Sequence, residues 1–152
     1  MARLLLPVVL LQSVIIAAPA HAAIEKTINV DGLVRHYFVF APADVKDRMP
    51  VVLVFHGGGG NARQMERYTG FDELADKRGF IVVYPESIEG NWNDGRGMDF
   101  IRAQRENIDD VKFVRDLLDD VDRDYNIDRR RVFATGISNG AIMSAVSNLK
   151  CN

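Results

Sequence analysis

Cysteine and histidine are scarce in this sequence of 152 residues, which contains one Cys and three His. Cys151 is the residue before the last, and His36 and His56 lie in unrelated segments. A structural zinc site takes four such ligands, usually in closely spaced pairs. We therefore expect no metal site. A lone cysteine makes no disulfide within the chain, so Cys151 either pairs with another chain or stays a buried free thiol.

An excess of charge is also missing, since the formal net charge is -2 and the pI is near 5.9. Domains that bind nucleic acid usually carry a clear basic surplus. We therefore expect no nucleic-acid partner. A hydrophobic content of 47% is typical of globular proteins, and the length corresponds to one domain or part of one.

No apolar run is long enough to span a bilayer, which needs about 18–20 residues. The longest run, residues 4–18, is interrupted by a proline and a glutamine, follows Arg3 and precedes Ala-His-Ala at 20–22. These are the three regions of a secretory signal peptide. We predict cleavage after Ala22, which leaves residues 23–152 as a secreted or periplasmic chain without a membrane partner.

Short apolar runs alternate with segments of helical pattern. Apolar residues dominate 51–55, 80–84 and 132–135, as in strands that are covered on both faces. The clearest helix starts at Asp109 and Asp110, and its apolar residues recur at spacings of three and four. Strands that alternate with helices predict an α/β fold with a parallel sheet.

Turn residues mark the ends of several elements. Asp31-Gly32 lies between two β-rich runs and predicts a two-residue hairpin. Asn61 is expected to cap a helical segment that Gly70 splits and Gly79 ends.

Two polar segments are predicted to be loops. Residues 87–104 are long and polar and contain Trp92, and loops of this length in a compact domain are usually functional or mobile. Trp92 could wall a substrate pocket or anchor the loop by packing, and the pattern leaves both roles open. The arginine run 129–131 is interpreted as a solvated loop rather than an anion site.

Residues 136–140 read Gly-Ile-Ser-Asn-Gly and lie between a predicted strand and a helix-like stretch, 141–149. This is the context of the nucleophile elbow of α/β-hydrolases, in which a sharp turn exposes the serine. Ser138 is therefore the candidate nucleophile. Side chains at either glycine of the motif are expected to clash with neighbouring elements.

Residues 56–60 read His-Gly-Gly-Gly-Gly and follow the predicted strand 51–55. Unobstructed backbone N–H groups suit an oxyanion hole, which stabilises the charge that develops during acyl transfer. One donor comes from such a loop and the other from the residue after the nucleophile. We assign these donors to the backbone N–H groups of Gly58 and Asn139. His56 is expected to brace the loop rather than to act as the base.

Several motifs occur together in one order along the chain. They are His-Gly-Gly-Gly-Gly-Asn-Ala at 56–62, Tyr-Pro at 84–85, Trp-Asn at 92–93, Gly-Arg-Gly at 95–97, Asp-Asp-Val at 109–111, Tyr-Asn-Ile-Asp at 125–128 and Thr-Gly-Ile-Ser-Asn-Gly-Ala at 135–141. On these motifs the chain resembles exported poly(3-hydroxybutyrate) depolymerase-like and feruloyl-esterase-like α/β-hydrolases. The resemblance implies hydrolysis of a polyester, feruloyl-polysaccharide or small ester through an acyl-enzyme on Ser138, with no metal or organic cofactor.

The sequence departs from that pattern after the elbow, because residues 139–152 contain no Asp, Glu or His. In this fold the acid and the histidine of the catalytic triad follow the serine. We therefore expect residues 23–152 to be the front part of a single α/β-hydrolase domain, truncated after the elbow helix and inactive alone. The open sheet edge at 132–135 would then favour non-specific self-association. The alternatives are a non-catalytic module that binds esters or polymers, and a peptidase of the same fold.

Overall fold

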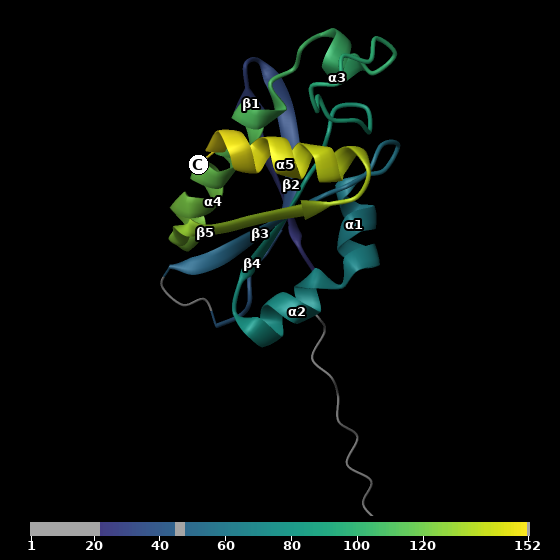
Figure 1. Ribbon diagram of the computed structural model, residues 1–152. Coiled ribbons are helices and arrows are strands. Elements are labelled where there is room, and N and C mark those ends of the chain that lie inside the picture. The colour runs from purple at the N-terminus through teal and green to yellow at the C-terminus, as the bar shows by residue number, and fades with distance from the viewer. Residues whose placement is uncertain (1–21, 45–47, 152) are drawn as a thin grey trace, which may run out of the picture.

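The computed structural model describes residues 22–44 and 48–151, so the predicted signal peptide lies outside the described residues except for Ala22 (Figure 1). The strands are β1 (Ile24–Val30), β2 (Leu33–Phe40), β3 (Met49–Phe55), β4 (Ile81–Pro85) and β5 (Ile127–Gly136). The helices are α1 (Ala62–Thr69), α2 (Phe71–Arg78), α3 (Arg102–Arg105), α4 (Asp110–Tyr125) and α5 (Asn139–Cys151). None of the helices in these described ranges is long and apolar enough to cross a membrane.

The five strands form one mixed sheet in the order β1-β2-β4-β3-β5. β3 pairs in parallel with both β4 and β5, whereas β2 is antiparallel to β1 and to β4. The predicted hairpin is confirmed: Asp31 and Gly32 have φ angles of 52° and 84°, and two positive φ angles are typical of a type I′ turn. The predicted parallel strands are confirmed as well, with β5 leading directly into α5 (Figure 1).

Two apolar clusters cover the two faces of the sheet. On one face, α4 and α5 contribute Phe113, Leu117 and Met143, which pack with inward side chains of the strands such as Leu53. On the other face, α1 and α2 contribute Ala62, Met65 and Ala75 to a second cluster. Each face is therefore covered by a helix pair, except that the face with α1 and α2 leaves Phe133 of β5 exposed.

The predicted helix ends between β3 and β4 are confirmed. The side chain of Asn61 accepts a hydrogen bond from the N–H of Gln64 at 2.9 Å, which satisfies one of the free donors at the start of α1. Gly70, with φ 63°, separates α1 from α2, and Gly79, with φ 73°, ends α2. Both glycines adopt the left-handed conformation that side chains disfavour.

The interpretation of residues 129–131 as a loop is wrong, because these arginines form the first half of β5. Their side chains are exposed and pair with nearby acids. Arg129 pairs with Asp122 at 3.1 Å, and Arg131 pairs with Asp128 at 2.8 Å. An exposed strand tolerates such charged side chains, so a basic run does not by itself indicate a loop.

A buried ion pair that the sequence did not reveal connects the hairpin to α4. Arg35 on β2 and Asp110 at the start of α4 are both about 1% exposed, and their charged atoms lie 2.7 Å apart. The guanidinium also lies over the ring of Phe113, 3.9 Å from its centre. At the start of the same helix, Asp109 caps α4 by accepting a hydrogen bond from the N–H of Lys112 at 2.8 Å, while Asp110 is buried against Arg35.

A half-buried acid, Asp72, connects α2 to the sheet by accepting a hydrogen bond from the hydroxyl of Tyr84 at 2.6 Å. Burial raises the pKa of Asp72 from 3.8 to about 6, and the negative charge of Glu66 adds to this, while the Tyr84 hydrogen bond opposes it. Because the folded-state pKa is raised, this acid contributes stability that is fully present below about pH 4 and is lost as the pH rises through about 6.

We therefore predict that Asp72→Asn stabilises the protein relative to the wild type at pH 7 but not at pH 4. The full shift corresponds to about 3 kcal/mol, and partial solvent screening reduces the expected difference to about 1 kcal/mol. Denaturant unfolding at both pH values measures it. Asp76→Asn, at an exposed position on the same helix, is the matched control, and an equal pH response of the two variants would contradict the prediction.

Candidate active site

Ser138 lies at the turn between β5 and α5, where the sequence predicts the nucleophile elbow. Its φ angle is 53°, in the left-handed region that non-glycine residues rarely adopt. The residue is exposed although the residue after it is buried. A serine held in a strained turn at the end of a strand, and open to solvent, can present its hydroxyl to a substrate.

The two glycines of the elbow lie against the backbone at the end of β3. A Cβ atom added to Gly136 would lie 2.7 Å from the carbonyl oxygen of Phe55, and one added to Gly140 would lie 2.2 Å from that of His56. Neither distance is compatible with a side chain. The expectation that side chains would clash at both positions is therefore confirmed, and the start of α5 is held against the end of β3.

The glycine loop after β3 lies beside the elbow. A Cβ atom placed on Gly57 would be 3.6 Å from the Cβ of Ser138, and one placed on Gly58 would be 3.9 Å from the Cβ of Asn139. In the described part of the chain, no hydrogen bond involves the backbone N–H of Gly58 or of Asn139. The two N–H groups predicted as oxyanion donors therefore belong to residues that lie close together in space, and neither N–H donates a hydrogen bond within the described residues.

His56 is 1% exposed, and both nitrogens of its ring have partners. Nδ1 lies 2.8 Å from the carbonyl oxygen of Gly57, while Nε2 lies 3.2 Å from the backbone nitrogen of Ser87 and 3.1 Å from Oε1 of Glu86. The ring thus links the glycine loop to the end of β4. This geometry fits a bracing role and leaves no nitrogen free to take a proton from Ser138.

The other described histidine, His36, lies on β2, with Nδ1 2.9 Å from a carboxylate oxygen of Glu25. It does not line the cleft at Ser138. Neither described histidine is therefore placed as the partner base of Ser138. Among the residues with described positions there is also no group of three or more His, Cys, Asp or Glu side chains arranged to hold a metal.

Trp92 is fully buried behind the elbow rather than exposed in a pocket. Its indole N–H donates to the carbonyl oxygen of His56 at 2.9 Å, and its ring meets that of Phe55 edge-on, with centres 5.2 Å apart. Trp92 is not among the side chains that line the cleft at Ser138. Of the two roles that the sequence left open, the geometry supports packing and not the pocket wall.

The side chain of Asn139 ties the Trp92 loop to the elbow helix. Its Oδ1 accepts from the N–H of Trp92 at 2.7 Å, and its Nδ2 donates to Asp94 at 2.5 Å. Asp94 is 4% exposed and also accepts from Gln104 at 2.9 Å and from Arg96 at 2.7 Å. Burial alone would raise the pKa of Asp94, but the hydrogen bonds from Arg96 and Asn139 outweigh it and lower the pKa.

The sequence did not predict this network, because the motif assigns a role only to the backbone of Asn139. The available signal was the dense polar segment around Trp92, with an aspartate that needs donors once it is buried.

A cleft of about 660 Å³ opens beside Ser138. The glycine loop forms its floor, α1 forms one wall, and Ile137 and Ser138 form the other. Its lining residues are His56, Gly57, Gly58, Gly60, Asn61, Gln64, Met65, Arg67, Tyr68, Ile137 and Ser138. A concave site that joins a candidate nucleophile to free backbone donors has two of the parts that acyl transfer requires, and a base is the third.

Comparison with known proteins places the chain among esterases. Residues 34–151 match the family described as "Esterase PHB depolymerase". The chain is 34% identical over 110 residues to an acetylxylan esterase of Coprinopsis cinerea, which covers 72% of the chain and 29% of that protein. It is 30% identical over 114 residues to poly(3-hydroxyalkanoate) depolymerase C of Paucimonas lemoignei, covering 72% and 26% respectively. The chain thus spans less than a third of these two curated relatives.

Solved esterases share the fold. An acetyl xylan esterase from Aspergillus awamori superimposes with a TM-score of 0.64 at 19% identity, over 81% of this chain and 46% of that one. A thermostable esterase from Pseudomonas putida ECU1011 superimposes with a TM-score of 0.57 at 26% identity, over 87% of this chain and 39% of that one.

We predict that Gly140→Ala destabilises the protein by about 3 kcal/mol or more, because the new methyl group would overlap the carbonyl oxygens of His56 and Phe55. Gly97→Ala is the control. Gly97 also has a positive φ, 71°, but has open space around it, so Gly97→Ala should lower the free energy of unfolding by only about 1–2 kcal/mol. Thermal and denaturant unfolding compare the two, and a smaller loss at Gly140 than at Gly97 would contradict the packing described here.

We also predict that Asn139→Ala costs about 2–4 kcal/mol, because it leaves the N–H of Trp92 and the carboxylate of Asp94 with fewer partners in a buried site. Ser144→Ala on the same helix removes a bond to the carbonyl oxygen of Ala141 and should change stability by less than about 0.5 kcal/mol. Denaturant unfolding monitored by the fluorescence of Trp92 is the measurement. Similar losses in both variants would argue against the network.

Proposed function

Because the chain belongs to the esterase family of PHB depolymerases and has the α/β-hydrolase fold, we propose that it acts in an exported serine hydrolase of carboxylic esters, with Ser138 as nucleophile. The observation that carries the proposal is the position of Ser138. Its strained turn lies beside a glycine loop with an unused N–H, at a cleft open to solvent.

In the proposed reaction, Oγ of Ser138 attacks the ester carbonyl while a general base takes the hydroxyl proton. The carbonyl oxygen becomes an oxyanion that accepts hydrogen bonds from the backbone N–H groups of Gly58 and Asn139. As the carbonyl re-forms, the bond to the alcohol oxygen breaks, and that oxygen leaves with the proton. Water then repeats the sequence on the acyl-enzyme and releases the acid.

We propose that the base and the acid that orients it come from outside the residues described here. Three observations support this: both ring nitrogens of His56 have partners, His36 does not line the cleft, and residues 139–152 contain no Asp, Glu or His. The same observations favour a second candidate function, a non-catalytic module that binds esters or polymers through the cleft.

The acyl group is proposed from the relatives. Their names identify acetylated xylan and poly(3-hydroxyalkanoate) as substrates of those proteins. Both are polymers that contain ester bonds, as acetyl side groups in acetylated xylan and as backbone links in poly(3-hydroxyalkanoate). An open cleft can admit a polymer chain more easily than an enclosed cavity can. We therefore propose a polymer-borne ester with a short acyl group or a hydroxyacyl unit as the substrate class. A peptidase of the same fold is the less favoured alternative, because the relatives named above act on esters.

We predict that p-nitrophenyl acetate transfers an acetyl group to Ser138 in residues 23–152, while steady turnover stays close to that of Ser138→Ala. Loss of triad members from serine hydrolases typically lowers turnover by about 10⁴–10⁶-fold, with residual catalysis from the oxyanion hole. Peptide mass spectrometry locates the acetyl group, and p-nitrophenol release gives the turnover.

Ser144→Ala, in the same helix, is the matched control and should be labelled like the wild type. Rapid turnover that depends on Ser138 would contradict the proposal that the base lies outside the described residues. Equal labelling of Ser138→Ala and the wild type would contradict the choice of nucleophile. Absence of any label on Ser138 would favour the binding module.

A further inference from the structure

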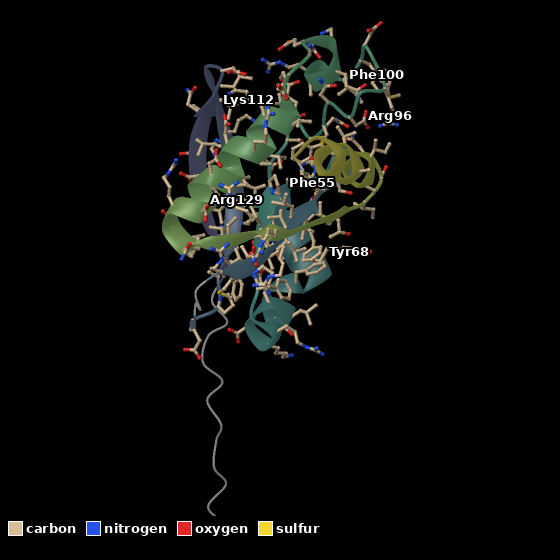
Figure 2. All side chains as sticks on the ribbon, turned by 60° about the vertical axis from the view of Figure 1, so that its left-hand side comes forward. Phe55, Tyr68, Arg96, Phe100, Lys112 and Arg129 are labelled. Carbon is tan, nitrogen blue, oxygen red and sulfur yellow. The ribbon has the colours of Figure 1, made fainter. Side chains whose placement is uncertain are left out.

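The wall of the cleft opposite the elbow is one face of α1. Arg67 and Tyr68 follow Gln64 by three and four residues, so both lie on the side of the helix that carries Gln64. All three residues line the cleft. All three are exposed, and Tyr68 is 79% exposed. In Figure 2, Tyr68 lies at the lower right, and Phe100, a similarly exposed aromatic residue outside the cleft, lies at the top.

Arg67 is the one Lys, Arg, Asp or Glu among the residues that line this cleft. No carboxylate within the described ranges pairs with its guanidinium, whose recorded contact is a 3.3 Å bond from Nε to the carbonyl oxygen of Arg63. The nearest acid in sequence, Glu66, already binds Arg63 at 2.7 Å and the N–H of Ala23 at 3.0 Å. The cleft therefore contains a positive charge that the fold leaves uncompensated.

The two neighbours of Arg67 supply different chemistry. The ring of Tyr68 presents a flat apolar face with a hydroxyl at its edge, which suits contact with another ring. The side-chain amide of Gln64 has no hydrogen-bond partner in the described structure and can both donate to and accept from hydroxyl groups. A ligand that satisfies all three side chains has a ring, hydroxyl groups and a negative charge.

We propose that this face of α1 is a subsite for an acidic sugar, so that the ester is presented on a uronate-containing polysaccharide. The carboxylate of the sugar pairs with the guanidinium of Arg67, its ring lies against Tyr68, and its hydroxyl groups bond Gln64. Guanidinium groups bind carboxylates through two parallel hydrogen bonds, which fixes orientation as well as adding affinity. The proposal rests on the proposed function only for the position of the ester at Ser138.

The test compares two trisaccharides that differ in charge, trigalacturonic acid and the neutral α-1,4-linked galactotriose, by calorimetric titration of the wild-type chain at low salt. We expect the acid to bind about threefold to tenfold more tightly, and added salt to remove the difference, because exposed ion pairs are screened. Arg67→Gln should remove the preference for the acid and leave the binding of galactotriose unchanged. Tyr68→Ala should weaken the binding of both sugars about threefold to tenfold.

Two variants outside the cleft are matched controls: Arg78→Gln, an exposed arginine at the end of α2, and Phe100→Ala. Both should bind like the wild type, and melting curves verify that every variant is folded. Equal binding of the two sugars, or equal behaviour of Arg67→Gln and Arg78→Gln, would overturn the proposal. A loss in Arg67→Gln without a loss in Tyr68→Ala would overturn the ring contact.

The measurement involves no ester and no reaction, so its result tests the subsite separately from the proposed function. Labelling of Ser138 without charge-selective binding would leave the esterase in place and remove the subsite. Charge-selective binding without labelling would support the subsite on a non-catalytic module.

Discussion

The backbone of Gly140 lies so close to the carbonyl oxygens of Phe55 and His56 that no side chain fits between them, and the rest of the site depends on this contact. It joins the start of α5 to the end of β3, although the two are far apart in the sequence. The glycine loop begins at His56, so the same contact sets Gly57 and Gly58 beside Ser138. The proposed nucleophile and its proposed donors are thus positioned by backbone packing, before any side chain contributes.

The carbonyl oxygen of His56 has a second function, because it also accepts the indole N–H of Trp92. Through this bond and the bonds of Asn139, a long polar segment is fastened to the elbow from behind. A segment with little regular structure must satisfy its buried polar groups individually. Here Asp94 and Gln104 do so with side-chain hydrogen bonds, which explains how a long loop can support a rigid turn.

The features that the sequence predicted are those with a local chemical cause. A hairpin needs two residues that accept positive φ, a helix start needs a capping oxygen, and an elbow needs glycines where backbones meet. Asp31-Gly32, Asn61 and the motif at 136–140 could therefore be recognised without a structure. The same reasoning extended to Gly70 and Gly79, because glycine in the left-handed conformation ends a helix wherever the helix lies.

The features that the sequence did not predict depend on which distant residue becomes the partner. Nothing near Arg35 indicates that its guanidinium meets Asp110, and nothing near Asn139 indicates Asp94. The arginines of β5 were predicted to form a loop because a run of charged residues usually indicates a solvent-exposed segment. A strand at the edge of a sheet can, however, be exposed and still be regular. Trp92 had two interpretations for the same reason, since an aromatic residue in a polar segment suits a pocket or a core equally well.

The alternation of β5 connects this packing to the chemistry of the cleft. Val132 and Ala134 pack against the core formed with α4 and α5, so Phe133 faces the other side, where it is 57% exposed. Ile137 follows directly after β5, is 48% exposed and lines the cleft. Ile137 therefore places an apolar surface next to Ser138 in the cleft. Backbone dipoles act more strongly where apolar groups exclude water, so this side chain would strengthen any hydrogen bonds from Gly58 and Asn139 to a developing oxyanion.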